Sequence, residues 1–230
     1  MAFAGGYDSQ TVARPVGLSQ VMGILSFMFL AMAAGAFLVP ASLYVPALIV
    51  EFALLFIMPV MARRDRARGK SVSSGTAGAL ALVFASAAGA VLAPLVQSLD
   101  QTTAGTTLLA EAAVITFTVF ALFGLYGLTT RRNLSGLGRV LFIALLALVG
   151  IMVLSLFFSQ FFSPFGLLIG LGGAGVFALL TAVDFQRAKY AGADDAVMVA
   201  VSIFLDFINL FVFILDILMI FGGGGLSRRR

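Results

Sequence analysis

The stretch AVMVAVSIFLDFINLFVFILDILMIF, residues 196–221, decides the fold that the sequence predicts. It is longer than the roughly 20 residues that a helix needs to cross a bilayer, yet it contains Asp206, Asn209 and Asp216. At about 100° per residue, Ser202 and these three side chains fall within one arc of roughly 80°. A charged side chain near the middle of a bilayer costs roughly 2.5–3.5 kcal/mol. We therefore expect this helix to lie inside a bundle, with its polar arc facing other helices.

The composition is that of a protein with many membrane spans. Of 230 residues, 61% are hydrophobic and 10% are charged, with a mean hydropathy of +1.12, whereas an average soluble domain has about 25% charged residues. The chain contains no cysteine and no histidine, which excludes disulfides, thiol chemistry, haem and zinc sites built on these residues. The basic residues lie in short segments between apolar runs, so the net charge of +4 predicts membrane orientation rather than nucleic-acid binding.

Seven apolar runs divide the chain, at residues 18–39, 43–62, 76–96, 107–128, 140–161, 164–184 and 196–221. They predict an all-α integral membrane protein whose seven transmembrane helices occupy residues 18–221. A cytoplasmic N-terminal tail at residues 1–17 and a C-terminal tail at residues 222–230 flank this domain. We expect no cleavable signal peptide, because the first run is too long for the apolar region of one.

The basic residues alternate between the two sides of the predicted bundle. With the N-terminus inside, the inner segments hold 11 of the 14 lysines and arginines, the outer loops hold none, and the C-terminal tail holds the other three. The positive-inside rule therefore places the N-terminus in the cytoplasm. A re-entrant last run would bring all 14 inside, but the length of that run favours a full span.

A glycine-rich segment, GLGGAG at residues 170–175, matches the dinucleotide-binding pattern G-x-G-x-x-G. That fingerprint requires a preceding strand within a βαβ unit, whereas this segment lies inside an apolar run. Small residues in membrane helices let neighbouring backbones approach closely. The segment therefore predicts close helix packing.

Charged residues within the runs and at their inner ends are the candidate functional groups. Glu51 lies about eight residues into the second run and is deep enough to need either a structural partner or an ion path. Asp184 and Asp206 approach from the inner side on consecutive helices, and their contact requires staggered helices. A helix-end acid exposed to solvent is the alternative for Asp184. Arg63 and Arg64 end the second run on the same side, where an arginine commonly anchors orientation.

Three segments together resemble a known family: YGLTTRRNLSGLG (126–138), VDFQ (183–186) and SIFLDFINLF (202–211). The chain resembles the Bax inhibitor-1 family, also called the transmembrane Bax inhibitor motif family, in its bacterial branch. The resemblance implies six helices wrapped around a central seventh, in a bacterial plasma (inner) membrane. It also implies a pH-sensitive calcium leak channel rather than an enzyme.

The resemblance further implies a gate. In the family, paired aspartates on helices six and seven sense protons, and an arginine on helix two latches to the helix-six acid. By matching position, the pair is Asp184 and Asp206, and the latch is Arg63 or Arg64, between which the sequence does not choose. Two carboxylates in one low-dielectric site do not both ionise cheaply, so they titrate as a coupled pair.

Calcium is the permeant ion that this resemblance implies. It prefers oxygen ligands, which Asp184 and Asp206 would supply transiently, because a leak path must also release its ion. Glu51, Asn209 and Asp216 are the further candidates along the pathway. We expect no tightly bound cofactor, and lipid and calcium as the main partners.

Two alternatives stay open at this point. A regulatory protein would bind a membrane-anchored quality-control protease, with the polar tail at residues 1–17 as the expected contact. An intramembrane aspartyl protease would also use two aspartates on helices six and seven. Against the protease, Asp206 lies in LDF rather than in a GxGD motif.

Overall fold

The computed structural model describes residues 17–67, 74–192 and 195–226. The long helices of the described part are α1 (Gly17–Leu38), α2 (Tyr44–Ala67), α3 (Ser74–Asp100), α4 (Thr103–Thr129), α5 (Ser135–Phe157), α7 (Gly166–Tyr190) and α8 (Ala196–Leu226). A short α6 (Ser159–Phe162) and two 3-10 turns, η1 (Ala41–Leu43) and η2 (Ser163–Phe165), complete the connections. Seven described helices are long and apolar enough to cross a membrane. The predicted all-α fold with seven spans is confirmed.

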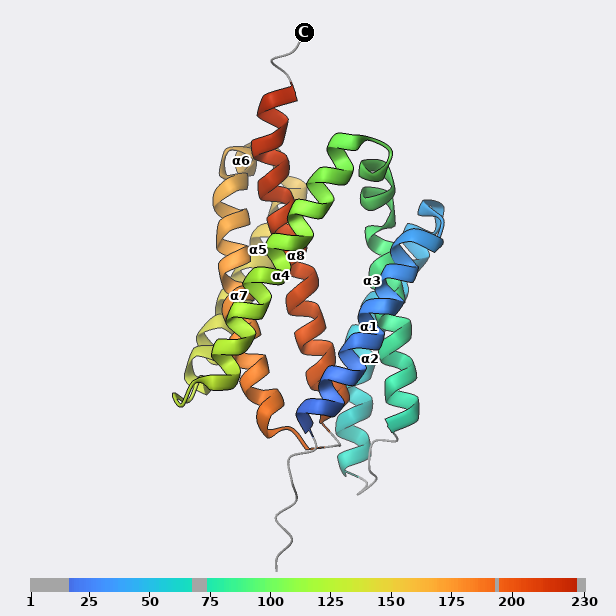
Figure 1. The fold of residues 1–230 in the computed structure, drawn as a ribbon, viewed down its shortest axis with the longest axis vertical. Coiled ribbons are helices and arrows are strands. Elements are labelled where there is room, and N and C mark those ends of the chain that lie inside the picture. The colour runs from blue at the N-terminus through green and yellow to red at the C-terminus, as the bar shows by residue number, and fades with distance from the viewer. Residues whose placement is uncertain (1–16, 68–73, 193–194, 227–230) are drawn as a thin grey trace, which may run out of the picture.

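The helices run alternately up and down between two ends of the bundle (Figure 1). The start of α1, the α4–α5 loop and the end of α7 share one end, and α8 reaches the opposite end. Because α8 has 31 residues, it is about 46 Å long and crosses the whole bundle instead of re-entering. Of the tails predicted at residues 1–17 and 222–230, residues 1–16 and 227–230 lie outside the described residues, and residues 222–226 continue α8.

Helix α8 is the central helix of the bundle (Figure 1). Of its most apolar stretch, 56% is buried, compared with 11% for α2 and for α5. It packs chiefly against α1, α3, α4 and α7, whereas α2 packs mainly on α3, and α5 mainly on α7. The expected arrangement of six helices around a central seventh is therefore confirmed in part: α8 is central, but four of the other long helices pack on it and two lie further out. This arrangement follows from the polar arc of α8, which only other helices can cover.

Aromatic side chains join α8 to its neighbours. The ring of Phe204 lies 5.7 Å from Phe29 of α1 and 6.1 Å from Phe84 of α3, measured between ring centroids. Phe207, which also contacts Phe29, meets Phe120 of α4 edge-to-face at 5.1 Å. Edge-to-face contacts of this kind add to the apolar burial. They fix α8 in the middle of the core cluster.

The glycine-rich segment on α7 packs against α8 as expected. A Cβ atom on Gly173 would lie 2.5 Å from the ring of Phe213, and one on Gly170 would lie 2.9 Å from Ile217. By contrast, a Cβ on Gly172 would meet nothing within 4 Å. The prediction of close helix packing is therefore confirmed for Gly170 and Gly173, which let α7 approach the large side chains of α8.

Candidate functional site

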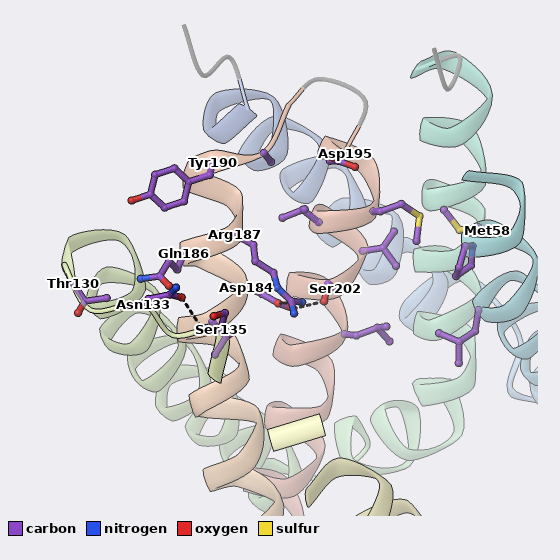
Figure 2. Close-up of a pocket in the computed structure, with 18 of the residues that line it drawn as sticks. Met58, Thr130, Asn133, Ser135, Asp184, Gln186, Arg187, Tyr190, Asp195 and Ser202 are labelled. Atoms are coloured by element: carbon purple, nitrogen blue, oxygen red, sulfur yellow. Dashed lines mark hydrogen bonds and ion pairs between the residues drawn. The ribbon is translucent and has the colours of Figure 1, made fainter. Parts of the chain in front are cut away.

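Asp184 is buried near the end of α7, and both its carboxylate oxygens are hydrogen-bonded. Arg187 Nη1 donates to Oδ1 at 2.9 Å, and the hydroxyl of Ser202 on α8 donates to Oδ2. Asp184 lies six residues before the end of α7, and Ser202 lies six residues after the start of α8. The two antiparallel helices therefore bring these side chains to the same level, as Figure 2 shows.

Asp206 lies one helical turn further along α8 than Ser202, about 6 Å deeper in the bundle. The residue is only 4% exposed, and its Oδ2 has no hydrogen-bond partner among the described residues. Burying an unpaired polar atom is costly, so such exceptions in a folded protein require an explanation. Asp206 is the residue of this core that most requires one.

Two cavities meet at this acidic pair. The first, which we call the Asp206 cavity, has a volume of about 720 Å³ and is lined mainly by α5, α7 and α8; Asp184, Asp206 and Asn209 are among its lining residues. The second, the large cavity, measures about 880 Å³ and is lined by α2, the α4–α5 loop, α7 and α8 (Figure 2). Asp184, Arg187 and Ser202 line both cavities. The hydrogen bonds of Asp184 therefore lie at the junction between them.

The other predicted pathway residues are not all gathered at this place. Asn209 lines the Asp206 cavity and donates its Nδ2 to the carbonyl oxygen of Leu205 at 2.8 Å. Glu51 on α2 and Asp216 in the second half of α8 are half-buried, and neither lines either cavity. The structure thus brings together Asp184, Asp206 and Asn209 only.

The cation that binds Asp184 in this structure is Arg187, one turn away on the same helix. Arg63 and Arg64 are exposed at the end of α2 and line neither cavity. A helix-two latch therefore stays a prediction. The spacing of Asp184 and Arg187, three residues apart on a helix, is a signal for ion pairing that the sequence already contains.

Ser202 is the second partner that the sequence did not identify. It belongs to the polar arc of α8, but which residue of α7 it faces depends on the register of two helices. Among the described residues, no group of three or more acidic side chains gathers that could hold a metal ion. The pair of Asp184 and Asp206 is the acidic site that the described part of the chain offers.

Replacing Ser202 with alanine is expected to lower the free energy of unfolding by about 1–2 kcal/mol, because a buried carboxylate oxygen loses its donor. Thermal unfolding in detergent would measure the change. Ser26→Ala is the matched control, since that exposed hydroxyl donates to the Met22 carbonyl of its own helix. Equal losses of unfolding free energy in the two variants would show that the hydrogen bond between Ser202 and Asp184 stabilises the fold no more than an exposed hydrogen bond within one helix does.

Comparison with known proteins agrees with this architecture. A family model described as "Inhibitor of apoptosis-promoting Bax1" matches residues 14–223. An uncharacterized protein of Helicobacter pylori (strain ATCC 700392 / 26695) is 36% identical over 139 residues, which are 60% of this chain and 59% of that protein. The match thus spans about three fifths of the relative's length.

Two further relatives match over more of their length. A Deinococcus radiodurans protein is 31% identical over 191 residues, covering 77% of this chain and 74% of the relative. An "Uncharacterized membrane protein" of Streptococcus pyogenes serotype M3 is 29% identical over 188 residues, covering 78% and 74%. The chain belongs to the Bax inhibitor-1 family of multi-pass membrane proteins, with relatives in several bacteria.

Proposed function

We propose that the protein is a calcium leak channel of a bacterial plasma membrane, with a cytoplasmic N-terminus, controlled by protonation of Asp184 and Asp206. The observation that carries the proposal is the buried, unpaired Oδ2 of Asp206 beside a cavity of about 720 Å³. Ionisable residues inside membrane spans are expensive and typically mark ion or proton paths. A carboxyl oxygen without a described hydrogen-bond partner in the central helix supports a cation that visits the site.

The two aspartates have different tasks in this proposal. Asp206 offers a carboxylate oxygen that no described residue occupies, which suits a hard cation such as Ca²⁺. Asp184 is held by Arg187 and Ser202, so it links the charge state of the site to the packing of α7 on α8. Because only one carboxylate is available without breaking these bonds, calcium binding is weak enough for the ion to leave.

Protonation supplies the control. Two carboxylates in one low-dielectric site titrate as a coupled pair, so a proton on one changes the charge state of the other. A proton on Asp184 would weaken its ion pair with Arg187 and bias the packing between α7 and α8. The chain contains no histidine, so these carboxylates are the titrating groups that the proposal needs.

Calcium flux into proteoliposomes between pH 5 and pH 8 tests the proposal. We expect flux above that of empty liposomes, a dependence of that flux on pH, and a flattened pH profile in Asp184→Asn. Absence of flux at every pH would overturn the channel. The alternative would then be a regulatory protein, for which the expected protease contact at residues 1–17 lies almost entirely outside the described residues.

A further inference from the structure

The large cavity is amphipathic. Its apolar wall comes from α2, α3 and α8 and includes Leu54, Met58 and Phe84, whereas its rim at the other side carries Arg131 and Arg132 of the α4–α5 loop. The volume of about 880 Å³ lies in the range of about 300–1,000 Å³ that is typical of ligand pockets. The shape and lining therefore suit a ligand with one anionic end and one apolar end.

The charge of the rim is positive and not fully matched. The charged residues that line the cavity are Arg131, Arg132, Arg187, Asp184 and Asp195. Arg187 pairs with Asp184, and Asp195 takes part in an interaction of its own. Within the described part of the chain, Arg131 and Arg132 form no ion pair. An anion is thus the group that would complete this rim.

Gln186 of α7 holds the loop that carries the two arginines. The side chain of Gln186 donates to the Arg132 carbonyl oxygen at 2.8 Å and accepts from the Leu134 backbone N–H at 2.8 Å. Asn133 Oδ1 also accepts from the Ser135 backbone N–H at 2.9 Å. Figure 2 shows Asn133, Ser135 and Gln186 together on this side of the cavity. A loop held in this way loses little conformational entropy when the rim binds a ligand.

The cavity lies next to the two helices that face the bilayer most. Only 11% of the most apolar stretch of α2 or α5 is buried, and Leu55 of α2, which is 37% exposed, lines both cavities. The apolar wall therefore includes side chains of α2, one of the two long helices that leave the most surface uncovered by the rest of the bundle. A soluble anion would leave that wall unused, and a neutral lipid would leave the arginines unused.

We propose that the large cavity binds one anionic phospholipid, with its phosphate on Arg131 and Arg132 and an acyl chain along the wall of α2 and α8. Guanidinium groups bind phosphate through charge-assisted, often bidentate hydrogen bonds. Basic pockets between transmembrane helices are suited to anionic headgroups. This inference does not depend on the channel proposal, because the lipid can bind whether or not the protein conducts calcium.

Lipid binding to the purified full chain in a neutral detergent tests the proposal, with native mass spectrometry for occupancy and thermal unfolding for stabilisation. The probes are phosphatidylglycerol and phosphatidylcholine with the same acyl chains. We expect phosphatidylglycerol to bind in a one-to-one complex and raise Tm more than phosphatidylcholine does. The Arg131→Gln/Arg132→Gln variant is expected to lose about tenfold or more in phosphatidylglycerol affinity, since each charge-assisted bond is worth over 1 kcal/mol.

Two matched controls separate the cavity from general surface charge and general surface packing. Arg64→Gln/Lys189→Gln removes the same charge at the same end of the bundle, from residues that do not line the cavity. We expect this variant to change the phosphatidylglycerol affinity by less than about twofold. Leu55→Trp places a larger side chain in the lining of the cavity and should weaken lipid binding, whereas Phe56→Trp, at a neighbour that is 68% exposed and does not line the cavity, should not.

Three outcomes would overturn the lipid site. Equal stabilisation by phosphatidylglycerol and phosphatidylcholine would assign the effect to annular lipid. Equal stabilisation by inorganic phosphate and phosphatidylglycerol would assign it to a free anion. Equal losses of phosphatidylglycerol affinity in the two double variants would assign it to net charge. The Tm of each variant without lipid reports whether it is folded.

Discussion

Asp206→Asn is expected to flatten the pH dependence of calcium flux and to lower the flux itself by roughly tenfold or more, which corresponds to about 1.4 kcal/mol in the barrier. Asparagine keeps the shape of the side chain but removes the carboxylate whose Oδ2 has no described partner. The cation then loses its ligand and the site loses one of its two titrating groups. Flux into proteoliposomes across pH 5 to 8 measures both effects.

Asp100→Asn is the matched control for this variant. Asp100 is an exposed acid at the end of α3 and lines neither cavity. The end of α3 and the end of α7 lie at opposite ends of the bundle (Figure 1). Its replacement is expected to leave the flux and the pH profile unchanged. An unchanged pH profile in Asp206→Asn, at equal amounts of reconstituted protein, would contradict the assignment of Asp206. Loss of a model substrate's cleavage in this variant would instead indicate an intramembrane aspartyl protease.

The helices could be predicted from apolar run length, but their ends could not. The run at residues 76–96 became α3 (Ser74–Asp100), and the run at residues 43–62 became α2 (Tyr44–Ala67). Both helices continue into polar sequence, because a helix satisfies its own backbone hydrogen bonds whether or not its side chains are apolar. Hydropathy reports the part of a helix that suits lipid, which is shorter than the helix itself.

The two aspartates could be identified because acids in apolar helices are exceptional. Their geometry could not, because it depends on the register of α7 against α8. A direct contact between Asp184 and Asp206 would require staggered helices, but the structure instead brings Asp184 level with Ser202. The short connection between the two helices, residues 191–195, explains this level arrangement. Asp206 therefore lies one turn deeper, without a described partner for its Oδ2.

Which helices pack directly on one another was also beyond prediction from one sequence. Small residues in a run predict that some helix packs closely against it, but not which helix. In the structure, Gly35 of α1 and Gly89 of α3 face each other's backbones: a Cβ on Gly35 would lie 2.0 Å from the Ser86 carbonyl oxygen, and one on Gly89 would lie 2.0 Å from that of Met32. Such reciprocal fit belongs to a pair of helices rather than to either sequence alone.

Gly35→Ala is expected to lower the free energy of unfolding by about 3 kcal/mol, the upper end of what overpacking costs. The added methyl group would overlap a backbone carbonyl, which has no rotamer that moves it aside, so α1 and α3 would have to separate. That separation would also loosen the contacts of Phe29 and Phe84 with Phe204 of α8. Thermal or denaturant-induced unfolding in detergent measures the loss.

Gly23→Ala tests the same substitution on the same helix without the close contact. A Cβ on Gly23 would meet nothing within 4 Å, and alanine is a better helix former than glycine by up to about 1 kcal/mol. Gly23→Ala is therefore expected to leave the stability unchanged or to raise it. Because both variants change the helix propensity of α1 in the same direction, their difference isolates the packing of α1 on α3. Equal shifts in Tm would mean that the two backbones do not approach at Gly35, and that aromatic contacts with α8 hold α1 in place instead.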